Sequence, residues 1–120
     1  MSKTYRYKNL TYSAADDEDV NFTVKFVSDG NMGQTVIDVP GDNDPEIEDE
    51  GTALLGKGED LRGDKTVSFS TIRNPVPEED NIIIEFFVND ELLVKHENEK
   101  AEEENPFIVL VIRFPEPEED

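Results

Sequence analysis

The sequence lacks cysteine and tryptophan, and each absence narrows what the protein can do. With no cysteine among the 120 residues, neither a disulfide framework nor thiol chemistry is possible. Aromatic residues make up only 8% of the chain, which argues against the exposed aromatic platforms that carbohydrate-binding proteins use. A chain without cysteine fits a reducing compartment, so we expect a cytoplasmic protein.

Long hydrophobic runs are also missing. No stretch approaches the roughly 20 apolar residues that a membrane helix needs, and residues 1–5 lack the apolar core of a signal peptide. We therefore expect a soluble protein with no membrane contact. The length suits one domain, which we place at residues 1–114, followed by an acidic, disordered tail at residues 115–120.

Positive charge is scarce, because 11 Lys and Arg stand against 30 Asp and Glu, for a net charge of −19. This balance argues against direct binding to nucleic acid or an anionic membrane, since both are bound through basic footprints. Most acids lie between the apolar runs, where they solvate loops and protect apolar strands from aggregation. An alternative function is a DNA mimic that occupies a basic nucleic-acid-binding site, which requires acids spaced roughly 6–7 Å apart along one face.

Short apolar stretches recur along the chain with turn residues between them. In residues 20–27, apolar and polar side chains alternate, as in a half-buried strand. About seven or eight such stretches predict an all-β fold, a single antiparallel β-sandwich, with a small barrel as the alternative. In the strand expected at residues 65–72, we expect Val67 and Phe69 to face the core. The expected strands are 5–12, 20–27, 34–39, 52–55, 65–72, 82–88, 92–96 and 107–114.

Residues 82–96 form the clearest hairpin. A three-residue loop, Asn89-Asp90-Glu91, pairs Val88 with Leu92 and places most apolar side chains on one face. The same register pairs Phe86 with Val94, Ile84 with His96 and Glu85 with Lys95, the last a favourable cross-strand ion pair. We therefore prefer this loop to a two-residue Asn89-Asp90 turn, although its left-handed position usually favours glycine.

The last expected strand, residues 107–114, is apolar on both faces. It is either a central strand covered by a loop, the lining of a ligand cavity, or part of a contact surface. For the contact surface we name Ile83, Phe87 and Leu93, together with part of residues 107–114. This surface would bind a protein partner or a second copy of the chain.

One acidic segment has the composition of a calcium loop. Hard cations take several oxygen ligands from flexible loops, and the candidate ligands here are Asp42, Asp44, Glu46 and Glu48. An EF-hand would need glycine at Ile47 and two flanking helices. The alternatives are therefore a calcium-binding β-domain and a solvated acidic loop, and no other cofactor is expected.

His96 is the only histidine, and no serine lies in a nucleophile-elbow context. A histidine that closes the apolar face of a hairpin is more often structural than catalytic. Zinc would need further histidine or cysteine ligands. We therefore predict that the protein is not an enzyme.

The stretch LLGKGEDLRGDKTV at residues 54–67, continued to Asn74-Pro75, resembles a segment of small uncharacterised bacterial β-sandwich proteins. In both, a glycine turn and an Asp-Leu-x-Gly step enter a strand that ends at Asn-Pro. The resemblance covers about a fifth of the chain. It implies the sandwich fold and no particular activity. The sequence as a whole predicts a non-enzymatic interaction or structural module.

Overall fold

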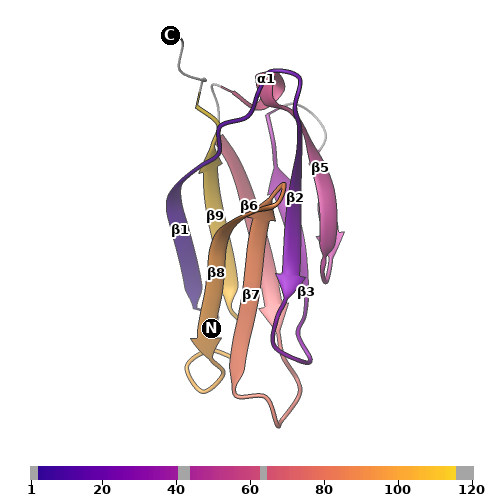
Figure 1. Ribbon diagram of the computed structural model, residues 1–120. Helices are drawn as coiled ribbons and strands as arrows, with labels where there is room; N and C mark the ends of the chain where they lie inside the picture. The colour runs from indigo at the N-terminus through magenta and orange to yellow at the C-terminus, as the bar shows by residue number, and fades with distance from the viewer. Residues whose placement is uncertain (1–2, 41–43, 63–64, 116–120) are drawn as a thin grey trace.

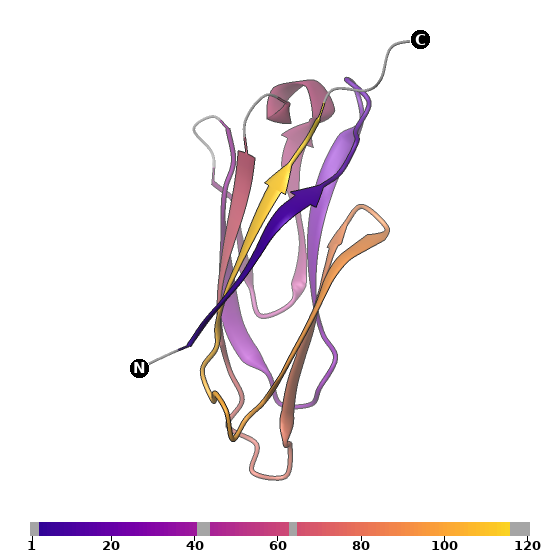
Figure 2. The same ribbon diagram turned by 90° about the vertical axis from the view of Figure 1, so that its left-hand side faces the viewer.

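The computed structural model describes residues 3–40, 44–62 and 65–115. These residues form two sheets packed face to face, with strand orders β1-β9-β6-β3-β4 and β5-β2-β7-β8 (Figures 1 and 2). No ladder joins the sheets within the described residues, so the predicted sandwich is confirmed and the barrel alternative is wrong. The elements are β1 (Thr4–Thr11), β2 (Asp19–Phe26), β3 (Met32–Asp38), β4 (Glu46–Glu48), β5 (Gly51–Lys57), α1 (Gly58–Leu61), β6 (Lys65–Arg73), β7 (Asn81–Val88), β8 (Glu91–Glu99) and β9 (Phe107–Arg113).

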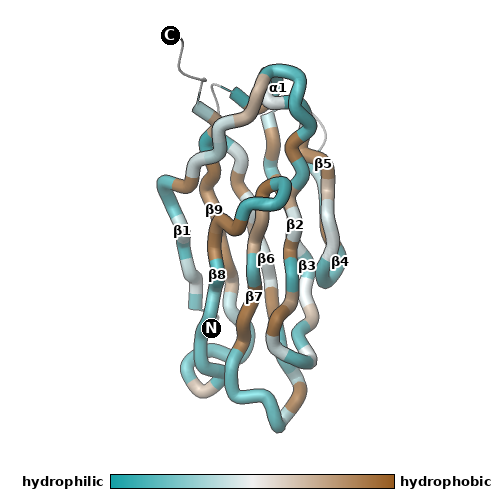
Figure 3. The backbone as a smooth tube through the Cα atoms, in the orientation of Figure 1, coloured by the Kyte–Doolittle hydropathy of each residue, from teal (hydrophilic) through white to brown (hydrophobic). Residues whose placement is uncertain are grey.

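The four-stranded sheet supplies the largest share of the core. Alternate residues of β2 and β7 are fully buried, because the period of two turns every second side chain toward the opposite sheet. Phe22 on β2 stacks on Phe86 on β7, with ring centroids 6.0 Å apart. Apolar residues concentrate along these central strands, while the connecting loops are hydrophilic (Figure 3).

In β6, the central strand of the five-stranded sheet, the side chains that face the core are the opposite set from the one predicted. Thr66, Ser68 and Ser70 are fully buried, whereas Phe69 is exposed and Val67 is only partly buried. The expectation that Val67 and Phe69 face the core is therefore wrong. Small hydroxyl side chains on β6 leave room between the sheets for the large side chains of β2 and β7, so close packing is kept with little bulk from β6.

The β7–β8 hairpin has a two-residue Asn89-Asp90 turn with Val88 opposite Glu91, so the predicted three-residue loop is wrong. Asn89 adopts a left-handed φ of 54°, which asparagine tolerates better than most residues. A β-bulge at Leu93 then shifts the register by one residue. Because of this shift, the strands beyond the bulge pair as predicted. Three predicted pairs are therefore confirmed, which are Phe86 with Val94, Glu85 with Lys95 and Ile84 with His96.

The acidic segment expected to be a continuous loop contains a strand. Ile47 is buried at the centre of β4, and Thr35 of β3 pairs with it. The predicted stub at residues 52–55 extends to the seven-residue strand β5. β4 lies at the edge of its sheet, where Ile47 packs into the core and Glu46 and Glu48 are exposed.

The first and last strands of the described domain lie side by side, because β1 pairs in parallel with β9. Of the predicted acidic tail, residues 116–120 lie outside the described residues. Within the described residues, no helix has the length and apolar composition required to cross a membrane.

Candidate interaction face

We call the side of the five-stranded sheet that points away from the four-stranded sheet the outer face. Strand pairing places its side chains in rows that run across all five strands. The middle row consists of Arg6 on β1, Val109 on β9, Phe69 on β6, Val36 on β3 and Glu46 on β4.

Apolar side chains fill the centre of the outer face on three adjacent strands. Phe69 is 38% exposed, and its ring stacks on Phe107 with centroids 6.2 Å apart and planes 16° from parallel. This apolar patch forms because β9 is apolar on both faces and β6 turns its larger side chains outward. Its members are Val36, Val67, Phe69, Phe107, Val109 and Val111.

The charges on the outer face differ from those of the chain as a whole. Among the paired positions of this face, four are basic and three are acidic, whereas the whole sequence has 30 acids against 11 bases. The outer face is therefore close to neutral in a molecule of net charge −19. The basic residues are Arg6, Lys65, Arg73 and Arg113, and the acidic residues are Asp38, Glu46 and Glu48.

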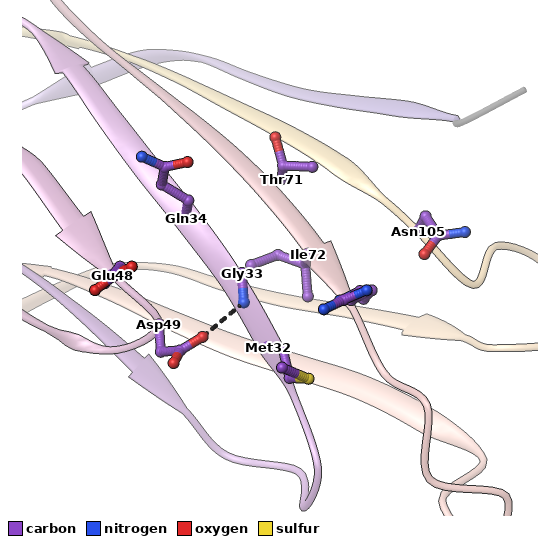
Figure 4. A pocket seen from close by; sticks show the side chains of 9 residues that line it. Met32, Gly33, Gln34, Glu48, Asp49, Thr71, Ile72 and Asn105 are labelled. Atoms are coloured by element: carbon purple, nitrogen blue, oxygen red, sulfur yellow. Dashed lines mark hydrogen bonds between the residues drawn. The ribbon is translucent and has the colours of Figure 1, made fainter.

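A groove of about 580 Å³ lies at one end of the outer face (Figure 4). Asp49 lines the groove and is held to Gly33 by two hydrogen bonds. Its backbone N–H donates to the Gly33 carbonyl at 2.8 Å, and its Oδ1 accepts from the Gly33 N–H at 2.9 Å. A side chain at Gly33 would place its Cβ 2.3 Å from the carbonyl oxygen of Thr71, so β3 and β6 approach closely only with glycine there. The groove is lined by Met32, Gly33, Gln34, Glu48, Asp49, Thr71, Ile72, Arg73 and Asn105.

The contact residues named from the sequence do not form one surface. Ile83 and Phe87 lie on the outer side of the four-stranded sheet, whereas the outward residues of β9 lie on the opposite layer. Leu93 packs partly against the core, and the bulge places Leu92 beside Phe87 instead. A charged row also separates Ile83 from Phe87, and it consists of Lys25, Glu85 and Lys95.

Of the candidate calcium ligands, Asp44 precedes β4, and Glu46 and Glu48 are the first and last residues of β4. Asp42 lies outside the described residues. The Asp44 carboxylate accepts a hydrogen bond from the Val39 N–H at 3.3 Å, and Glu46 and Glu48 are exposed on β4. Among the described residues, no three His, Cys, Asp or Glu side chains come together in a group that could hold a metal ion. The calcium hypothesis remains a prediction.

His96 lies fully buried between the edge strands β1 and β8, within a chain of hydrogen bonds. Asn98 donates its amide hydrogens to the carbonyls of Glu99 and Glu103, so its Oδ1 accepts from His96 Nε2–H at 2.7 Å. His96 Nδ1 is then unprotonated and accepts from the Tyr7 hydroxyl at 2.7 Å. Both ring nitrogens are satisfied, which makes this histidine a structural link between the sheets.

Burial lowers the pKa of the His96 imidazole below its ordinary value of 6.5, against the opposing hydrogen bond to Asn98 and the charges of Glu102 and Glu97. The pKa of His96 is lower in the folded state than in the unfolded state. The buried neutral imidazole therefore makes its full contribution to the free energy of unfolding above about pH 6.5, and this contribution is lost as the pH falls. We predict that the wild-type free energy of unfolding falls by up to about 1.4 kcal/mol more than that of His96→Gln between pH 7.5 and 5.5.

Denaturant unfolding at the two pH values checks this prediction. Carboxylate titration occurs in both proteins and cancels in the comparison. Parallel pH profiles for the two proteins would contradict a buried neutral histidine.

Sequence reasoning missed the outer face because it assigned the wrong side of β6 to the core. The signal was present in the alternation of residues 66–70, where hydroxyl residues alternate with Val67 and Phe69. Either set could have faced inward. Because β9 is apolar on both of its sides, the pairs of Val67 with Val111 and of Phe69 with Val109 do not decide between the two sets.

Comparison with protein-family models, curated proteins and solved structures finds no match for this chain. The resemblance of residues 54–67 to small bacterial β-sandwich proteins therefore stays a prediction.

Proposed function

We propose that the protein is a non-enzymatic β-sandwich interaction module whose binding surface is the outer face of the five-stranded sheet. The orientation of β6 carries this proposal. Its hydroxyl residues are buried while Phe69 is 38% exposed, and the Thr66 and Ser68 hydroxyls have no hydrogen-bond partner among the described residues. A buried hydroxyl without a partner costs free energy, and the same orientation of β6 leaves the Phe69 ring on the surface, where a partner can cover it.

The distribution of apolar residues supports the outer face over the other sheet. Phe69 and Phe107 stack at the centre of one continuous patch. On the four-stranded sheet, the strongly exposed Leu54 and Leu92 lie on opposite edge strands, β5 and β8. Contiguous apolar surface bounded by charged residues is typical of protein-binding sites, whereas scattered single residues are common on any surface.

His96 supports a structural role for the polar cluster rather than catalysis. A general base must reach a substrate proton through a hydrogen bond or one water. His96 is fully buried and both of its ring nitrogens are occupied by Tyr7 and Asn98. The lowered pKa follows from burial and needs no catalytic explanation.

Site-specific photo-cross-linking tests the binding surface. A photoreactive residue is placed at Thr71 on the outer face and, as the matched control, at Thr23 on the outer side of the four-stranded sheet. In cells that produce the protein, we expect an adduct from position 71 that disappears when Phe69→Ser is added. Adducts from position 23 alone, or adducts from position 71 that do not depend on Phe69, would contradict the proposal.

A further inference from the structure

We propose that the occupant of the outer face is a second copy of the chain, packed face to face about a two-fold axis parallel to β6. This inference rests on the proposed function of that face and adds the partner and its orientation. Two observations point to it, which are the charge order along the middle row and the area of the face.

The middle row is basic at one edge and acidic at the other. Arg6 occupies the β1 edge, Glu46 occupies the β4 edge, and both are exposed. Between them lie Val109, Phe69 and Val36, so the order is basic, apolar, aromatic, apolar and acidic. Phe69 lies on β6, the third of the five strands, and is the centre of the row.

A two-fold axis parallel to β6 reverses the row in the second copy. Arg6 of each copy then lies over Glu46 of the other, Val109 lies over Val36, and the two Phe69 rings meet at the axis. The contact is isologous and closed, so it gives a dimer rather than a filament. Both pairs of opposite charges form at the rim of an apolar centre, which is the usual anatomy of an interface.

A two-fold axis that lies in the plane of the face but runs perpendicular to the strands gives the opposite charge pairing. It would place Arg6 over Arg6 and Glu46 over Glu46, and like charges across an interface are unfavourable. Both axes allow the aligned packing typical of stacked sheets. The charge order therefore selects the axis parallel to the strands. Either axis brings the basic ends of β6 together, with Lys65 over Lys65 and Arg73 over Arg73 about the parallel axis and Lys65 over Arg73 about the perpendicular one. These two residues therefore do not select between the axes.

The area is sufficient for a stable contact. The strands lie about 4.8 Å apart and rise about 3.3 Å per residue, so β1, β3, β6 and β9, with seven to nine residues each, and the three-residue β4 give a face of roughly 540 Å². Two such faces bury roughly 1,100 Å² in total, just above the approximately 1,000 Å² expected of a biological interface. The side chains project from this plane, so the buried area is somewhat larger.

The net charge of −19 opposes association at long range. The facing surfaces themselves are close to neutral, and the remaining acids act over longer distances. Charges farther apart than about 8 Å are largely screened at physiological ionic strength. We therefore expect dimerisation to be weak at very low salt and to strengthen as salt rises toward the physiological range.

Charge reversal tests the orientation, with sedimentation velocity of the purified full chain at physiological salt as the measurement. Arg6→Glu faces Glu46 with a second acid, and Glu46→Arg faces Arg6 with a second base, so we expect each single variant to dimerise about tenfold more weakly than the wild type. An equimolar mixture of the two variants, and the double variant, both restore opposite charges. We expect both to dimerise like the wild type.

Each outcome bears on a separate claim. A wild-type dimer that Phe69→Ser dissociates but the single charge reversals leave unchanged would overturn the orientation. A wild-type monomer at every concentration, with a Phe69-dependent adduct of another protein from position 71, would overturn the second copy while leaving the interaction face intact. A monomer with no adduct from position 71 would overturn both. Circular dichroism confirms that each variant is folded.

Discussion

Phe86→Ala is expected to lower the free energy of unfolding by about 3–5 kcal/mol, because its fully buried ring lies at the centre of the core. Truncation removes the stack on Phe22 on the adjacent strand β2 and leaves a cavity between the sheets. Surrounding side chains fill such a cavity only in part. This loss is a large fraction of the roughly 5–15 kcal/mol that stabilises a typical domain.

Phe69→Ala is the matched control for Phe86→Ala, since the same truncation is made on the outer face. Its ring is 38% exposed and stacks on Phe107. We expect a loss of about 1 kcal/mol or less. Denaturant unfolding at low protein concentration measures both variants without a contribution from association. If Phe86→Ala fails to fold, Phe86→Leu provides a milder truncation. Equal losses at positions 69 and 86 would contradict the assigned orientation of β6.

His96→Leu is expected to lower the free energy of unfolding by about 2–4 kcal/mol. The change leaves the Tyr7 hydroxyl and Asn98 Oδ1 without their hydrogen-bond partner in the space between β1 and β8. Each buried polar group without a partner costs about 1–3 kcal/mol. Urea unfolding at pH 7.5 measures the loss while His96 is neutral in the wild type.

A double-mutant cycle with Tyr7→Phe separates the hydrogen bond from packing. Removing both partners leaves no unsatisfied hydroxyl, so the double variant should lose less than the sum of the single losses. Additive losses would contradict a coupled hydrogen-bond network. Tyr5 contacts the His96 ring edge-on, with centroids 4.6 Å apart. This contact is lost in both variants that carry His96→Leu, so its loss cancels in the cycle.

The sequence predicted the sandwich because β2 has a strong hydrophobic periodicity and because β7 and β9 are short apolar runs bounded by turn residues. The placement of Val20, Phe22 and Val24 on one buried face follows directly from their alternation. The same reasoning failed on β6, where hydroxyl and apolar residues alternate and either set could have faced inward. Only the bulk of Phe22 and Phe86 on the facing sheet decides between them, and that is a tertiary effect.

The candidate face could not be located from the sequence because it joins distant segments. Arg6 and Glu46 enter one row only through the strand order β1-β9-β6-β3-β4, which combines a parallel pair with antiparallel pairs. Only part of the hairpin register could be predicted from the sequence. The pair of Glu85 and Lys95 was predictable, whereas the bulge at Leu93 was not. A bulge reverses the side-chain alternation with no signal in the hydrophobic pattern.

The most direct test of the central claim is the cross-linking yield from position 71 compared with position 23. The two positions lie on the outward sides of the two sheets, so the comparison asks which layer meets a partner. We predict an adduct from position 71 that Phe69→Ser removes, and little or none from position 23. A Phe69-independent yield, or a yield confined to position 23, would show that the outer face of the five-stranded sheet is not the binding surface.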